Sequence, residues 1–173
     1  KKIKENNFKG KPYPIDIKKR NASIYLDGEF IYSDNKIVFS KNLKRNLVGI
    51  YNLKNIMVAF QVSRILHLND ELTLKAISEF KTLNYRLELV GEVDDIKYYV
   101  DTLATIPEAT KESIQALENV NTLIFGGMDR GISYEGFAKY LEKTKIEHFI
   151  CMPTTGHTIG KELPTTKTYF VDT

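Results

Sequence analysis

Tyr-Arg-Leu-Glu-Leu-Val-Gly-Glu-Val-Asp-Asp-Ile-Lys-Tyr-Tyr-Val-Asp-Thr-Leu-Ala-Thr-Ile-Pro-Glu-Ala-Thr, residues 85–110, is the most informative stretch of this chain. Its first half alternates apolar and acidic residues up to the polar pair Asp94-Asp95, and a second apolar run covers 96–100. This pattern is typical of a β-hairpin. Pro107 and Glu108 then form a good first turn for a helix that extends to about Leu117.

Polar residues follow the second strand of this predicted hairpin. Asp101, Thr102 and Thr105 lie where a buried strand gives way to a loop. Ligands of open parallel α/β sheets bind at the carboxyl ends of the strands. We therefore expect these three side chains to face a crevice.

The chain beyond Thr110 alternates apolar strand patterns, at 122–127, 147–152 and 168–171, with helical patterns, at 107–117 and 134–142. Such alternation predicts a mainly parallel sheet with right-handed crossovers. Asp101, the loop 126–130 and Thr154 should then lie along one edge of that sheet. For Gly126-Gly127 with Asp129 and Arg130, a ligand site and a plain turn are equally supported.

Residues 1–83 follow a different pattern. A loose or strand-like entry precedes apolar positions between Ala22 and Phe39, which flank an Asp27-Gly28 turn and predict a small antiparallel sheet of two or three strands. A helix from about residue 49 to 66 comes next, with Asn52 as its N-cap. Its apolar stripe is Leu53, Ile56, Met57, Phe60 and Ile65.

A second helix is predicted from about Glu71 to Leu83, and a domain boundary near Asn84. Its apolar face would comprise Leu72, Ala76, Ile77 and Phe80. The predicted fold class is therefore α/β: a small hairpin layer with helices, followed by a Rossmann-like domain with a mainly parallel sheet.

Composition indicates a globular chain. It has 173 residues, 42% of them hydrophobic, and a net charge of +3 from 25 basic and 22 acidic residues. This balance gives no argument for nucleic acid or a membrane surface as partner. The lone Cys151 fits a reducing compartment, and we expect it to be a core thiol. His67, His148 and His157 are scattered, so structural or surface roles are expected and no metal site is predicted.

Four motifs occur in a fixed order: Gly49-Ile-Tyr-Asn52-x-x-Asn55, Tyr85-Arg86-Leu-Glu88, Asp101-Thr-Leu-Ala-Thr105-x-Pro107, and Gly126-Gly-x-Asp129-Arg130-Gly131. Together they resemble the ATP-dependent Mur ligases, and in particular the branch that adds glutamate. The resemblance covers about residues 20–173. It implies that residues 1–83 are the C-terminal part of a central ATP-binding domain and 84–173 an incomplete Rossmann-like C-terminal ligase domain.

The resemblance also implies the reaction, which is amide formation through an acyl phosphate with ATP and Mg²⁺. The substrates would be UDP-MurNAc-L-alanine and glutamate, and the enzyme a cytoplasmic monomer without nucleic-acid binding or membrane insertion. The family's Gly-x-x-Gly-Lys-Ser/Thr phosphate loop does not occur in this chain. We therefore expect the metal ligands upstream, the chain to be part of a longer protein, and residues 1–173 alone to be inactive.

Site residues carry over by position within the motifs. Asn52 and Asn55 match asparagines near the adenine, Asp101 matches the acidic residue near the ribose, and Arg86 matches the arginine that reaches the ATP phosphates. Thr105 and Arg130 match residues that meet the amino acid, Arg130 through its carboxylate. The asparagines could instead have capping and surface roles, and Arg86 could instead form an interdomain ion pair.

Leu103 departs from the family pattern, which has lysine at this position. The change removes a charge-assisted contact worth about 1.5 to 3 kcal/mol. D-Glutamate, L-glutamate and another acidic acceptor therefore stay open. A folylpolyglutamate synthase-like ligase and a non-catalytic nucleotide-binding α/β module stay open as well.

Overall fold

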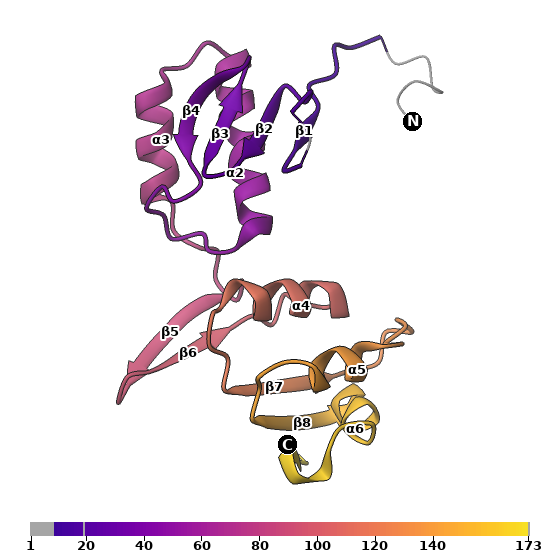
Figure 1. The fold of residues 1–173 in the computed structure, drawn as a ribbon. Coiled ribbons are helices and arrows are strands. Elements are labelled where there is room, and N and C mark those ends of the chain that lie inside the picture. The colour runs from indigo at the N-terminus through magenta and orange to yellow at the C-terminus, as the bar shows by residue number, and fades with distance from the viewer. Residues whose placement is uncertain (1–8, 19, 173) are drawn as a thin grey trace. The chain divides into compact units, whose positions relative to one another are not determined.

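The computed structural model describes residues 9–18 and 20–172 (Figure 1). The predicted loose or strand-like entry, residues 1 to about 20, is therefore described only in part, and its described part contains a short strand at Ile15–Asp16. The chain forms two compact units, Lys1–Thr82 and Leu83–Thr173. Both mix helices and strands, which confirms the α/β class. None of the described helices is long and apolar enough to cross a membrane.

The first unit contains a four-stranded sheet in the order β1-β2-β3-β4. Strand β1 (Ile15–Asp16) pairs in parallel with β2 (Ile24–Asp27), and β2, β3 (Phe30–Ser33) and β4 (Lys36–Ser40) form an antiparallel meander. Because Asp27 pairs with Phe30, the two loop residues are Gly28 and Glu29. The predicted Asp27-Gly28 turn is therefore one residue too early, while the optional third strand is confirmed as β4.

Two helices, α2 (Ile50–Ile65) and α3 (Asp70–Glu79), complete this unit. The predicted stripe of α2 is confirmed except at Ile65, which is 41% exposed at the last turn. On α3 only Ile77 is buried, and the helix ends before Phe80 because that residue adopts an extended conformation. The core consists of Ile24, Ile31, Phe39, Leu53, Ile56, Met57, Phe60 and Ile77.

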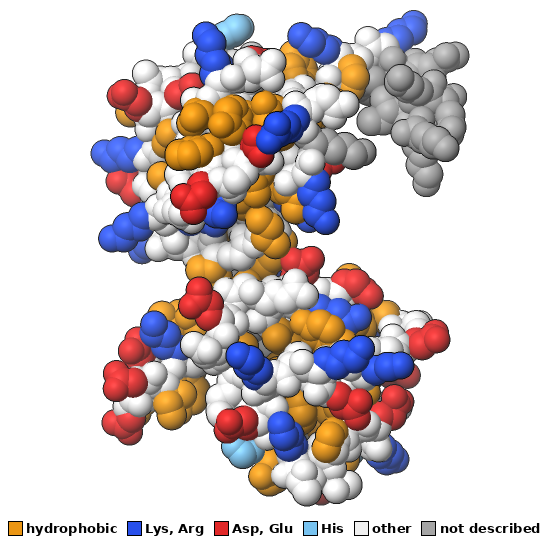
Figure 2. Space-filling model, viewed as in Figure 1, with side chains coloured by type: hydrophobic (Ala, Val, Ile, Leu, Met, Phe, Trp, Pro, Cys, Tyr) orange, Lys and Arg blue, Asp and Glu red, His pale blue; other side chains and the backbone are white. Residues whose placement is uncertain are grey.

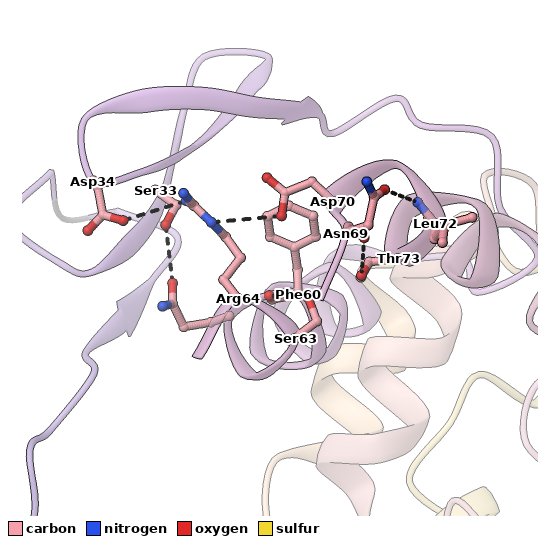
Figure 3. Close-up of polar contacts among 10 residues, drawn as sticks. Ser33, Asp34, Phe60, Ser63, Arg64, Asn69, Asp70, Leu72 and Thr73 are labelled. Atoms are coloured by element: carbon pink, nitrogen blue, oxygen red, sulfur yellow. Dashed lines mark hydrogen bonds and ion pairs between the residues drawn. The ribbon is translucent and has the colours of Figure 1, made fainter. Parts of the chain in front are cut away.

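Polar contacts join the sheet to α2, and α2 to α3, in the first unit (Figure 3). The buried Ser33 hydroxyl donates to Oε1 of Gln61 at 3.3 Å. Arg64, on α2, lies 3.6 Å from an Asp34 carboxylate oxygen and 3.8 Å from an Asp70 carboxylate oxygen. These contacts fix the register of α2 against the β3–β4 turn and the start of α3.

The second unit begins with the predicted hairpin, formed by β5 (Glu88–Val93) and β6 (Ile96–Val100). Asp94 and Asp95 form its turn, with positive φ angles of 50° and 63°. Figure 2 shows acidic side chains gathered at the tip of this hairpin, on the left of the view. Helix α4 (Pro107–Ala116) follows and begins with Pro107 as predicted.

A parallel three-stranded sheet completes the second unit, in the order β7 (Thr122–Gly127), β8 (His148–Thr154), β9 (Thr168–Phe170). Helix α5 (Phe137–Glu142) starts three residues later than the predicted Tyr134, after Gly136 in a left-handed conformation. Helix α6 (Thr155–Gly160) and a 3₁₀ turn (Thr165–Lys167) connect β8 to β9. The core comprises Phe137, Ala138, Leu141, Ile146, Phe149, Cys151, Ile159 and Leu163.

Candidate functional site

Arg86 lies in a tight loop that precedes β5. Its neighbours Tyr85 and Leu87 both have positive φ angles, 61° and 46°, which residues with a Cβ atom rarely adopt. The Tyr85 N–H donates to Oε2 of Glu88 at 2.7 Å, and the Leu87 side chain is buried at 5% exposure. Arg86 itself is half-buried. Its side chain extends from a backbone turn that the Tyr85–Glu88 hydrogen bond helps to hold.

Asp101 connects this loop to helix α4. Its Oδ1 accepts the Leu87 N–H at 3.0 Å, and its Oδ2 accepts the hydroxyl of Ser113, which lies on α4. Both carboxylate oxygens therefore have protein donors. Sequence reasoning missed Ser113; the only available signal was a serine inside a helix, where serine has modest propensity.

Leu103 contributes to the site through main-chain atoms. Its N–H donates to the Tyr85 carbonyl at 3.2 Å. Its own carbonyl accepts from the Thr105 N–H at 3.0 Å and from Nη1 of Arg86 at 3.4 Å. The structure thus brings Arg86, Asp101 and Thr105 together on two loops that are held to each other.

Two members of this group, Arg86 and Thr105, have donors of the kind that anionic ligands require. The guanidinium of Arg86 has a planar set of donors that suits phosphate or carboxylate oxygens. The exposed Thr105 adds a hydroxyl that can donate or accept.

The carboxyl edge of the parallel sheet carries a second group of predicted residues. Gly127 pairs with Thr154, and the hydroxyls of Thr154 and Thr155 both donate to the Gly127 carbonyl at 3.1 Å. Arg130 is exposed in the loop that follows β7. Within residues 9–18 and 20–172, no hydrogen bond or ion pair links Arg130 to Asp101 or Thr105.

The prediction of one shared sheet edge is therefore right for Gly127 and Thr154 and wrong for Asp101. Asp101 follows β6, which in the described part of the chain pairs with β5 and not with β7. Strand β6 finds its pairing partner in the neighbouring strand β5, so the alternation of strands and helices does not force β6 into the parallel sheet.

Asn52 and Asn55 lie in the first unit, on α2. The N-cap of α2 is Gly49, and Asn52 lies inside the first turn, so the capping prediction is wrong. A capping side chain accepts a backbone N–H, whereas Nδ2 of Asn52 donates to the Val48 carbonyl at 2.8 Å. Nδ2 of Asn55 donates in turn to Oδ1 of Asn52 at 3.4 Å.

The loop before α2 forms a shallow hollow next to these amides. Arg45 organises it, since its guanidinium donates to the carbonyls of Lys41 at 2.6 Å, Leu43 at 3.0 Å and Leu47 at 3.0 Å. Burial lowers the pKa of Arg45. The hollow is lined by Leu43, Lys44, Arg45, Leu47, Val48 and Gly49.

Cys151, His148 and His157 have structural surroundings. Cys151 is fully buried on β8, as predicted, and burial raises the pKa of its thiol. The ring of His157 lies with Nε2 2.9 Å from the Val171 carbonyl oxygen, and His148 packs on Tyr169. Among the described residues, no three His, Cys, Asp or Glu side chains are grouped so that they could hold a metal ion.

Comparison with known proteins finds relatives over most of the chain. UDP-N-acetylmuramoylalanine–D-glutamate ligase of Rickettsia prowazekii is 30% identical over 146 residues, which are 84% of this chain and 32% of that protein. The enzyme of the same name from Caldanaerobacter subterraneus is 32% identical over 88% of this chain and 34% of its own length. The chain thus spans about a third of the length of these curated relatives. No protein-family model matches it.

Solved structures show the same fold. MurC from Thermotoga maritima superposes with a TM-score of 0.73 at 19% identity, over 92% of this chain and 39% of that one. MurF from Acinetobacter baumannii gives a TM-score of 0.70 at 13% identity, over 88% of this chain and 36% of that one. Over most of its length, this chain is therefore similar in sequence to D-glutamate-adding Mur ligases, and it shares the fold of the Mur ligases MurC and MurF.

Proposed function

We propose that this chain is part of an ATP-dependent ligase that adds glutamate to UDP-MurNAc-L-alanine in peptidoglycan precursor synthesis. The observation that carries the proposal is a set of hydrogen bonds that links three matched residues. Asp101 accepts from Leu87, the residue next to Arg86. The Leu103 carbonyl accepts from both Arg86 and the Thr105 N–H. The matched arginine and the matched threonine thereby lie on neighbouring loops of one unit. The similarity to relatives named as D-glutamate ligases supports the choice of reaction.

In the proposed reaction, the carboxylate of UDP-MurNAc-L-alanine attacks the γ-phosphorus of ATP, and ADP leaves. The amine of glutamate then attacks the acyl carbon, and phosphate leaves with the acyl–oxygen electron pair while the nitrogen loses a proton. Arg86 would stabilise the charge on the transferred phosphoryl group. Thr105 and Arg130 would bind glutamate, Arg130 at a carboxylate, and so aim the amine at the acyl carbon.

Within each unit, the donor and acceptor groups of the matched residues suit a part of ATP. The amides of Asn52 and Asn55 can both donate and accept at an adenine edge. Both oxygens of Asp101 already accept one hydrogen bond each, but a carboxylate has about four acceptor positions, so two remain for ribose hydroxyls. Mg²⁺ would supply charge neutralisation of the phosphates, and we expect its ligands outside the described residues.

We further propose that the first unit is the C-terminal part of the central ATP-binding domain and the second most of the Rossmann-like ligase domain. The complete enzyme would be a cytoplasmic monomer. Its substrates are small molecules, and neither nucleic acid nor membrane insertion belongs to the proposal.

The test is ADP release by the complete enzyme. We expect release only when UDP-MurNAc-L-alanine and an acidic amino acid are both present, with D-glutamate and L-glutamate assayed in parallel. Omission of either substrate is the matched control. Equal turnover with a folate-type acceptor, or none with either enantiomer of glutamate, would contradict the proposal.

A further inference from the structure

We propose that Ser113 is a positioning residue for Arg86, acting through the carboxylate of Asp101. The inference rests on the proposed function, because it assigns Arg86 to the phosphates of ATP. It adds a residue that lies outside all four sequence motifs, on the second turn of α4.

The Arg86 loop needs external support. Tyr85 and Leu87, on either side of Arg86, both have left-handed backbone conformations in which a Cβ atom is unfavourable. An isolated loop would relax to more favourable angles and move the guanidinium. Three contacts oppose this relaxation: Tyr85 N–H to Glu88, Leu103 N–H to the Tyr85 carbonyl, and Leu87 N–H to Asp101.

Asp101 can hold the Arg86 loop only if its carboxylate keeps this orientation. Its Oδ1 holds Leu87, immediately after Arg86, so rotation of the carboxylate would release the loop. The hydroxyl of Ser113 fixes the other oxygen, Oδ2, from a helix. Helix α4 is a rigid element, and it therefore gives the loop a stable reference point.

Ser113 has one hydroxyl proton and two acceptors within reach. The Ala109 carbonyl, at 3.1 Å, is neutral, whereas the carboxylate of Asp101 is a charged acceptor. Charge-assisted hydrogen bonds are the stronger ones, so the proton goes to Asp101. Because this hydroxyl bonds within the protein, its substitution removes none of the groups assigned to ATP and glutamate and acts only on their positions.

A double-mutant cycle in the complete enzyme tests the inference. We expect Ser113→Ala to lower kcat/KM for ATP about tenfold, with little change in Tm, since a hydrogen bond to a charged group is lost. In an Arg86→Ala background the same change should alter kcat/KM less than about twofold, because the residue that it positions is absent. Ser113→Thr, which keeps the hydroxyl, should restore most of the activity.

Ser78→Ala is the matched control, because the hydroxyl of Ser78 bonds to its own helix, at the Lys75 carbonyl. It should leave kcat/KM unchanged. If Ser113→Ala does not fold, Ser113→Thr and Ser113→Val replace it in the cycle, since they match in size and differ in the hydroxyl.

Two results overturn the inference: an unchanged kcat/KM in Ser113→Ala, or an equal loss in the wild-type and Arg86→Ala backgrounds. An inactive wild-type enzyme would instead overturn the proposed function, so the two failures are distinguishable.

Discussion

Leu103 shows how one position can combine a fixed and a variable role. Its main-chain atoms hold Tyr85, Thr105 and Arg86, while its side chain is 51% exposed. The backbone contacts do not depend on the side chain. A different residue at this position should therefore change recognition without changing the loops.

Leu103→Lys in the complete enzyme tests this separation. Restoring an ammonium should add a charge-assisted contact of about 1.5 to 3 kcal/mol and lower the KM for glutamate tenfold or more. Steady-state kinetics with D- and L-glutamate, together with Tm, provide the measurement. Leu103→Met, similar in length and uncharged, is the control. An equal fall in KM in Leu103→Met would show that charge is not the cause.

The sequence predicted which loops carry Arg86, Asp101 and Thr105, because their motifs bracket a recognisable hairpin and helix. It could not predict what Asp101 contacts. The partners are a backbone N–H in a strained loop and a hydroxyl on α4, and neither has a local sequence signal. Asn52 was mistaken for an N-cap for a related reason: propensity does not reveal that the N-cap of α2 is Gly49, three residues earlier.

At the level of elements, β7 and β8 approach each other closely at their carboxyl ends. A Cβ atom on Gly126 would lie 2.3 Å from the Met152 carbonyl oxygen, whereas one on Gly127 would meet nothing within 4 Å. Both glycines have positive φ angles, 145° and 130°. Both positions therefore need a positive φ angle, but only Gly127 has room for a Cβ atom.

We predict that Gly126→Ala destabilises the protein more than Gly127→Ala. Both should lose about 1 kcal/mol or more to an unfavourable backbone, and Gly126→Ala a further 1 to 3 kcal/mol or so to the clash with β8. Urea unfolding of the two variants gives the difference. Equal losses would mean that β8 moves aside at no cost.

Element types were predictable where an apolar run or a periodic apolar stripe is clear, as in β7 and in α2 respectively. The boundaries of elements were harder to predict. Helix α5 starts three residues later than predicted, and α3 ends four residues earlier. The assembly of β6 was mispredicted because strand–helix alternation indicates a parallel sheet and says nothing of which strands join it. Tertiary pairing decided that outcome.

At the scale of the whole molecule, the chain has two units with separate hydrophobic cores. It spans about a third of the length of its curated relatives. The residues assigned to nucleotide and amino acid are present, but the 173 residues contain no Gly-x-x-Gly-Lys-Ser/Thr loop for the phosphates.

Residues 1–173 alone should therefore bind nucleotide weakly at best and form no amide. The measurement is ATP-dependent phosphate release and product formation with UDP-MurNAc-L-alanine and D-glutamate, with the complete enzyme as positive control. Measurable amide formation by residues 1–173 would show that the chain holds its own phosphate site.

The β5–β6 hairpin has a consequence for association between chains. It exposes Leu89, Val93 and Ile96 at 50%, 59% and 58%, which on a flat strand would invite pairing with another chain. A register shift between Leu89 and Gly91 interrupts the ladder, and the acidic tip adds repulsion between copies. We therefore expect the irregularities of this hairpin to disfavour pairing with another chain.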